Sequence, residues 1–240
     1  MPQISSLALT LFLVLVALLA GGLVLAIHGA AGRAEAPTLS RRWTWRAAIL
    51  VVLWLLIPAL LAQWGILRNF SAVPPPFLPL VGSLALIAAG LAFSSFGARL
   101  VNGISIGWLV GFQSFRLPLE WLLHRLFQEG VVPVQMTYAG RNFDFITGAL
   151  ALLLGCWAMF SRPPRWAIWL FNLVGLALLI NIVTIAILST PVPFRKFFNE
   201  PANTFIAYFP YVWLPTFLVQ AAWFGHLLVF RWLRQSRQVQ

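Results

Sequence analysis

Residues 113–147 read QSFRLPLEWLLHRLFQEGVVPVQMTYAGRNFDFIT and contain three of the five acidic side chains of the chain. If the first part of this stretch is helical, Gln113, Arg116, Glu120 and His124 fall within an arc of about 80°. Charged side chains within a membrane segment are costly, and they usually face the protein interior or a wet cavity. The stretch therefore predicts a polar seam that faces inward, with apolar segments packed around it.

The composition defines the class of protein. Of 240 residues, 61% are hydrophobic and only 9% are charged, whereas a soluble domain has about 25% charged residues. Apolar runs near the length of a membrane-spanning helix recur along the chain. We therefore expect a polytopic, all-α integral membrane protein, with a single membrane domain over 1–240. The net charge of +11 does not indicate nucleic-acid binding, because the arginines lie at segment ends, where lipid headgroups attract them.

Seven membrane-spanning segments are predicted. Their approximate ranges are 7–28, 45–66, 77–96, 103–128, 143–160, 166–188 and 208–232. The first segment has no basic residues before it and is long for a signal-peptide core, so we expect it to be retained. The small residues from Gly29 to Gly32 leave cleavage open as an alternative.

The basic side chains predict the orientation. With the N-terminus outside and the C-terminus cytoplasmic, most of the 16 Lys and Arg residues fall on the inner side, as the positive-inside rule requires. The bacterial inner (plasma) membrane is the expected location. The same orientation places Glu120, Glu129, Asp144 and Glu200 on the outer side, and only Glu35 on the inner side. It predicts a polar, charged vestibule that opens outward, between segments 103–128 and 143–160 and the loop before 208–232.

The candidate ligand-binding residues come from this outer region. They are Gln113, Arg116, Glu120, His124, Arg141, Asn142, Asp144 and Glu200. Two simpler interpretations stay open. Arg116 and Glu120 are four residues apart and can neutralise each other along the helix. Asn142 and Asp144 are typical helix N-terminal residues, which accept free backbone N–H groups.

Catalysis is an alternative to simple binding. Glu120 and His124 share a helix face, and Asp144 can supply a third group, as an acid–base pair needs for a lipid-linked substrate. The spacing Glu-x-x-x-His is common by chance, and a metal would need further ligands. We predict no metal site, and Cys156 is the only cysteine.

One cofactor is considered. His28 and His226 are predicted at similar depth, and two histidines on facing helices can ligate a b-type haem. Each is a lone histidine in an apolar run, so no cofactor is the main expectation.

The sequence thus predicts an inner-membrane protein that binds or transports a small polar or amphipathic molecule, with the lipid bilayer as its surroundings. A structural subunit of a membrane complex is a further alternative. Gly103, Gly107 and Gly111 form a small-xxx-small repeat that allows close helix packing, within this chain or against a partner helix.

Overall fold

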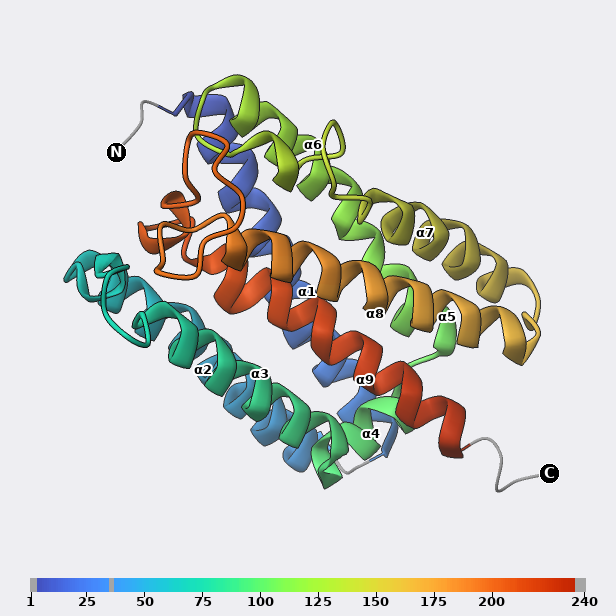
Figure 1. Ribbon diagram of the computed structural model, residues 1–240. Helices are drawn as coiled ribbons and strands as arrows, with labels where there is room; N and C mark the ends of the chain where they lie inside the picture. Colours follow the sequence, from blue (N-terminus) through green and yellow to red (C-terminus); the bar gives the residue numbers. More distant parts are fainter. Residues whose placement is uncertain (1–3, 35–36, 236–240) are drawn as a thin grey trace.

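The computed structural model describes residues 4–34 and 37–235, and within those ranges the chain forms helices and no strand (Figure 1). The α-helices are α1 (Ser6–Ala34), α2 (Pro37–Gln63), α3 (Phe77–Phe93), α4 (Ser95–Gly103), α5 (Ile106–Gly111), α6 (Arg116–Gln128), α7 (Phe145–Phe160), α8 (Arg165–Leu188) and α9 (Val219–Gln235). Shorter helical segments are 3₁₀ turns at Ile66–Arg68, Phe112–Phe115, Val134–Met136 and Phe205–Ala207, and a π-helical turn at Leu214–Leu218. The expected all-helical fold is confirmed.

Three helices are long and apolar enough to cross a membrane. They are Ser6–Arg33, Leu39–Gln63 and Arg165–Leu188. The pair α3 and α4 qualifies as a fourth only if it counts as one span bent by 63°, and Asp144–Phe160 is a shorter apolar helix. These helices are compatible with a membrane protein. Seven spans, and the orientation of the chain, stay predictions.

The fourth predicted segment, 103–128, is not one helix, and this prediction was wrong. α4 ends at Gly103, the backbone is extended at Ile104, and α5 begins a new helix. α4 itself was missed. Its start is capped by Ser94, whose hydroxyl accepts a hydrogen bond from the backbone N–H of Phe96, a strong helix-start signal.

The bend between α3 and α4 depends on a glycine. A Cβ atom on Gly97 would lie 2.0 Å from the carbonyl oxygen of Ala92, so no larger residue fits there without moving the backbone. The bend of 63° therefore follows from the sequence Ser94-Ser95-Phe96-Gly97.

The last predicted segment also begins later than expected. Residues 208–213 precede the helix, which begins with the π-helical turn at Leu214 and continues as α9. Pro210 has no backbone N–H to donate to a preceding turn, which disfavours helix at this point. Because the helix starts later, its midpoint lies at a later residue than predicted. Different residues of the helix therefore lie at the centre of the protein.

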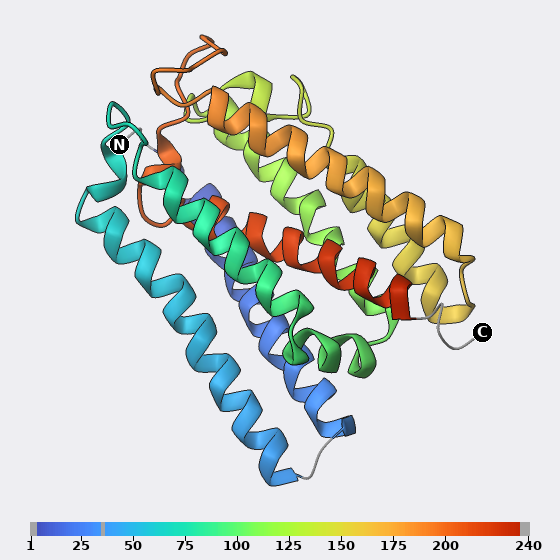
Figure 2. The same ribbon diagram turned by 60° about the horizontal axis from the view of Figure 1, so that its bottom comes forward.

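The helices surround α9. α3 and α8 pack on different sides of α9, while α1 contacts α2, α4 and α6, and α7 contacts α5, α6 and α8 (Figures 1 and 2). The start of α1 lies at one end of the molecule, with the loops that precede α7 and α9, and the end of α9 lies at the other end. We call the first of these the loop end.

The glycine repeat lies at contacts between helices of this same chain. A Cβ on Gly103 would lie 2.6 Å from Ala30 in α1, and one on Gly107 would lie 3.2 Å from Ala158 in α7. A Cβ on Gly155 of α7 would lie 2.6 Å from the Cα of Gly111. Small residues let these helices approach closely, so the repeat supports packing of α4 on α1 and of α5 on α7.

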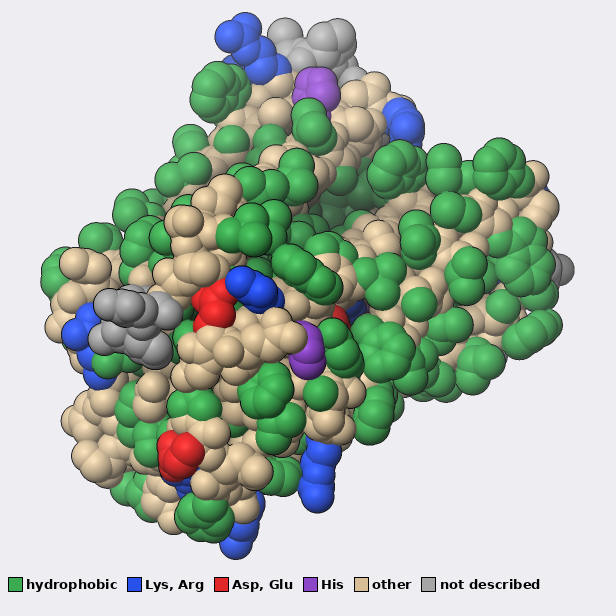
Figure 3. Space-filling model, turned by 90° about the horizontal axis from the view of Figure 1, so that it is seen from above, with side chains coloured by type: hydrophobic (Ala, Val, Ile, Leu, Met, Phe, Trp, Pro, Cys, Tyr) green, Lys and Arg blue, Asp and Glu red, His purple; other side chains and the backbone are tan. Residues whose placement is uncertain are grey.

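The outer surface is strongly apolar. Figure 3, seen from above, shows hydrophobic side chains over much of the surface and only small patches of acidic and basic ones. Large apolar side chains are among the most exposed in the described residues, including Leu86, Phe160 and Trp166. An extended apolar surface of this kind marks contact with a membrane or a partner.

Candidate functional site

A tight turn at the end of α6 brings the start of α7 back over it. Gly130 has a φ of +70°, which favours glycine, and the backbone N–H of Val131 donates to the carbonyl of Leu126 at 2.9 Å. Farther along the loop, Asn142 Nδ2 donates to the carbonyl of Met136 at 3.1 Å. Asn142 and Asp144 are thereby placed against α6.

Arg116 is the centre of the site, and its side chain is 1% exposed. Its Nη1 donates to Asp144 Oδ1 at 2.6 Å and to the carbonyl of Gly175 at 3.3 Å. Its Nη2 donates to His226 Nε2 at 3.1 Å. The guanidinium thus joins the first residue of α6 to the start of α7, the middle of α8 and the middle of α9.

His226 continues the network and is fully buried. Because its Nε2 accepts from a guanidinium, the ring proton belongs on Nδ1, which then donates to Asn172 Oδ1 at 2.8 Å. Asn172 Nδ2 donates in turn to the carbonyl of His226 at 3.1 Å. Gly175 leaves room for this ring, since a Cβ there would lie 2.6 Å from His226 Cε1.

Glu120 and Asp144 are linked through an amide. Asn142 Nδ2 donates to Glu120 Oε2 at 2.6 Å, and Asn142 Oδ1 accepts the backbone N–H of Asp144 at 3.1 Å. Asp144 Oδ1 also accepts the hydroxyl of Thr147 at 3.1 Å. Arg116, Glu120, Asn142, Asp144, Asn172 and His226 form one buried polar network, which we call the Arg116 cluster.

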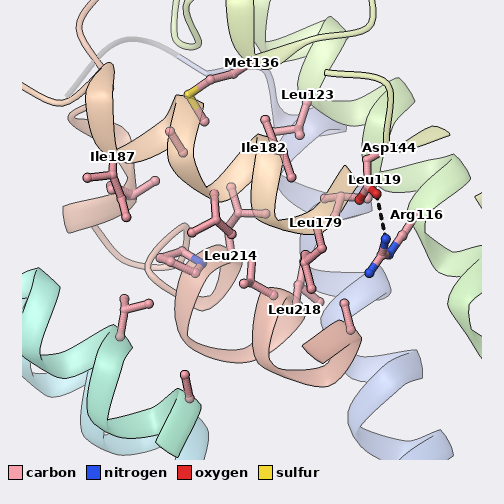
Figure 4. Close-up of a pocket in the computed structure, with 18 of the residues that line it drawn as sticks. Arg116, Leu119, Leu123, Met136, Asp144, Leu179, Ile182, Ile187, Leu214 and Leu218 are labelled. Atoms are coloured by element: carbon pink, nitrogen blue, oxygen red, sulfur yellow. Dashed lines mark hydrogen bonds and ion pairs between the residues drawn. The ribbon is translucent and has the colours of Figure 1, made fainter. Parts of the chain in front are cut away.

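A cavity of about 320 Å³ adjoins the Arg116 cluster. Its wall consists mainly of apolar side chains from α3, α6, α8 and the start of the last helix, and its charged lining residues are Arg116, Glu120 and Asp144. Figure 4 shows the Arg116–Asp144 pair at one side, beside Leu119 and Leu179. We call this the main cavity. It differs from the predicted polar vestibule in being largely apolar.

A second cavity of about 210 Å³ lies between α1, α2, α3 and α9. Apolar and aromatic side chains line it, with Arg46 and Gln220 as its polar members. It contains no residue of the Arg116 cluster.

The predicted site residues divide into two groups. Gln113, Arg116, Glu120, Asn142 and Asp144 are buried. Gln113 Nε2 donates to the carbonyl of Ala222. This hydrogen bond attaches the 3₁₀ turn before α6 to α9. The predicted inward direction of the seam is confirmed for Gln113, Arg116 and Glu120.

The other predicted residues lie outside the cluster. The ring of His124 stacks on Tyr138 with ring centroids 4.3 Å apart. Arg141 is exposed and lies over the ring of Phe197. Glu200, whose side chain is 71% exposed, pairs with Arg195. The structure therefore does not join His124 to Glu120 and Asp144: His124 lies one turn after Glu120 on α6, and its ring packs on Tyr138 of the loop before α7.

Two pairings expected from sequence spacing are replaced by longer-range ones. Arg116 forms its ion pair with Asp144 and has no hydrogen bond to Glu120. Asp144 stands at the N-cap position of α7, but its carboxylate makes no capping bond and binds Arg116 and Thr147 instead.

Glu129 serves a separate contact at the loop end. Ser5, just before α1, donates its backbone N–H to Glu129 Oε2 at 2.9 Å, and Arg125 donates to Oε1 at 3.0 Å. Burial of Glu129 raises its pKa, but the hydrogen bonds from Ser5 and the charge of Arg125 outweigh it, so the pKa lies below the ordinary value. The four acids expected to cluster are thus divided among three places. Glu35 lies outside the described residues.

Neither a metal nor a haem site gains support. Within residues 4–34 and 37–235, no group of three or more His, Cys, Asp or Glu side chains is placed to hold a metal. His28 Nδ1 bonds to Thr44, and both ring nitrogens of His226 have partners in the cluster. A haem between His28 and His226 stays a prediction.

Sequence reasoning missed the partners from α8 and α9. Asn172 and His226 lie in apolar runs as single polar residues, and Gly175 is not polar at all. The available signal was that an ionisable residue inside an apolar segment is a site candidate by default. Because the last helix begins at Leu214, His226 lies near the middle of that helix, where the signal applies to it.

No curated protein and no solved structure matches this chain. Residues 77–234 match the family described as a domain of unknown function, DUF8737. The matched stretch runs from the start of α3 into the last turn of α9, so it contains the whole Arg116 cluster and all residues that line the main cavity. Since the match covers more than half of the chain, the protein belongs to the DUF8737 family.

Proposed function

We propose that the protein binds an amphipathic small molecule in the main cavity, with the apolar part of the ligand among α3, α8 and α9 and its headgroup beside the Arg116 cluster. The observation that carries this proposal is the composition of the cavity wall, which is apolar apart from three charged side chains of one buried network. A mostly apolar pocket with a few convergent polar groups is the usual form of a small-molecule site.

The size of the cavity supports a compact ligand or one short alkyl chain. A volume of about 320 Å³ is near the lower end of the roughly 300–1,000 Å³ of small-molecule pockets. If a heavy-atom group takes about as much space as a water molecule in the liquid, roughly 30 Å³, the cavity holds on the order of ten groups. A decyl chain is therefore a suitable probe.

The position of the cavity supports entry from the loop end. Met136 and Ile206, from the loops before α7 and α9, belong to its lining. In the orientation that the arginines predict, this end faces outward, and we include that orientation in the proposal. Transport would need a second opening toward the other end, so binding is the function that the geometry supports best.

The proposal is tested by equilibrium binding of radiolabelled 1-decanol to the purified protein in zwitterionic lipid nanodiscs. Gly82 lines the cavity and a Cβ there meets no heavy atom within 4 Å, so Gly82→Leu adds a side chain at the cavity without a backbone clash. We expect saturable binding by the wild type and loss of that component in Gly82→Leu. Gly22→Leu on α1, where a Cβ is equally unhindered, is the matched control and retains it. Equal binding by all three proteins contradicts the proposal.

A further inference from the structure

We propose that the headgroup recognised in the main cavity is cationic, of the amine type, and that Glu120 binds it. This inference rests on the proposed function and adds the chemical class of the ligand. Its starting point is the charge of the cavity wall. Two carboxylic acids and one guanidinium are the charged groups that line it, so the wall has one acid more than it has cations.

The positive charge of Arg116 is already matched. Its Nη1 lies 2.6 Å from Asp144 Oδ1, and the two side chains are 1% and 5% exposed. The remaining Nη1 and Nη2 bonds go to the carbonyl of Gly175 and to His226. Arg116 Nε has no hydrogen-bond partner among the described residues, but it is fully buried. An anionic headgroup beside this pair would lie next to Asp144 and Glu120, whose negative charges would repel it.

Glu120 is the acid without a cationic partner. Its side chain is 2% exposed and it lines the cavity. Oε2 accepts from Asn142, a neutral amide, and Oε1 has no hydrogen-bond donor among the described residues. A buried carboxylate is stable in its ionised form only when its surroundings supply both an opposite charge and hydrogen bonds. Asn142 supplies one hydrogen bond and no charge.

An ammonium group completes this arrangement. It supplies the missing charge and a donor for Oε1, and a hydrogen bond between charged groups is about twice as strong as a neutral one. A hydroxyl group supplies only the donor. A carboxylate supplies neither, and it would lie next to two acids. The order of preference that follows is amine, then alcohol, then carboxylate.

Displacement of bound radiolabelled 1-decanol by unlabelled decylamine, 1-decanol and decanoate tests this order in zwitterionic nanodiscs at pH 7. The amine is then protonated and the acid is ionised, judging by ordinary pKa values of about 10.4 for an alkylamine and about 4 for a carboxylic acid. We expect decylamine to compete at least about tenfold better than decanol, and decanoate to compete worse than decanol. This part of the test needs only the wild type. A preference for decanoate, or equal competition by all three compounds, overturns the inference.

Glu120→Gln tests the assignment to the residue. It keeps the side-chain length and an acceptor oxygen, so we expect decanol binding to persist while the advantage of decylamine falls to within about twofold. Glu200→Gln removes an acid of equal charge from the exposed surface and must leave the advantage unchanged. If Glu200→Gln abolishes it, or Glu120→Gln does not, Glu120 is not the headgroup partner. If the wild type shows no saturable binding of decanol at all, the proposed function itself is contradicted.

Discussion

Replacing Arg116 by Met tests whether the buried cluster is held together by charge. Met is similar in length and apolar, so the change removes the guanidinium with little change in packing. It leaves Asp144 and Glu120 as two buried acids without a cation, and it removes the donors to the Gly175 carbonyl and to His226.

The expected loss of stability follows from burial. Because Arg116 is 1% exposed, its removal belongs to the class in which one partner of a buried pair is deleted, which costs about 3–5 kcal/mol. In a chain of this size each kcal/mol shifts the unfolding midpoint by about 2–4 °C, so the midpoint should fall by roughly 6–20 °C. Thermal unfolding of the detergent-solubilised protein, followed by circular dichroism, measures this shift.

The second half of the test is a double variant. Adding Asp144→Asn to Arg116→Met removes one of the two uncompensated acids, and Asn keeps an acceptor for Thr147. We expect the double variant to be more stable than Arg116→Met by at least about 1 kcal/mol, a coupling typical of one ion-pair network. Glu200→Gln, which breaks an exposed pair, should change stability by no more than about 1 kcal/mol. A double variant less stable than Arg116→Met, as simple addition of two losses would give, refutes the reasoning.

Three further predictions concern single positions. Gly175→Ala should lower stability by about 1–3 kcal/mol in chemical denaturation, because its Cβ would lie 2.6 Å from His226 Cε1, whereas Gly22→Ala should not. Gly97→Ala should be at least as harmful by the same assay, since the close contact is with the backbone carbonyl of Ala92. Glu129 has a lowered pKa in the folded protein, so its contribution is present above the unfolded value of about 4.3 and is lost as pH falls through the lower folded value. Wild type should therefore unfold at a higher temperature than Glu129→Gln at pH 6, and the difference should disappear at strongly acidic pH; a difference that grows on acidification contradicts the assignment.

The sequence predicted the helices better than their breaks. Long apolar runs gave α1, α2 and α8 because hydrophobicity over about 20 residues is a local property. The break at Ile104 was missed, because a glycine repeat and an apolar pattern continue through it. The bend at Gly97 has a local cause, the close approach of Gly97 to the carbonyl of Ala92, but the hydrophobic pattern does not record it.

For the site, the direction of the seam was predictable and its partners were not. A charged residue in an apolar helix faces inward for energetic reasons, and Arg116 and Glu120 do. The ion pair with Asp144 and the hydrogen bond with His226 join residues 28 and 110 positions apart. Spacing along one helix suggested Glu120 and His124 as partners instead, since such rules apply only to neighbours on the same helix.

Photo-crosslinking tests the central claim most directly, that an amphipathic ligand lies between α3, α8 and α9 beside Glu120. Decylamine with a diazirine at its tail is added to the protein in nanodiscs, irradiated, and located by mass spectrometry of the peptides. We predict crosslinks in the lining of the main cavity, at residues 179–187 of α8 and 214–222 before and within α9, competed by unlabelled decylamine and reduced in Gly82→Leu. Crosslinks confined to the second cavity, or to outward-facing side chains such as Leu25, Leu86 and Phe160, would contradict it.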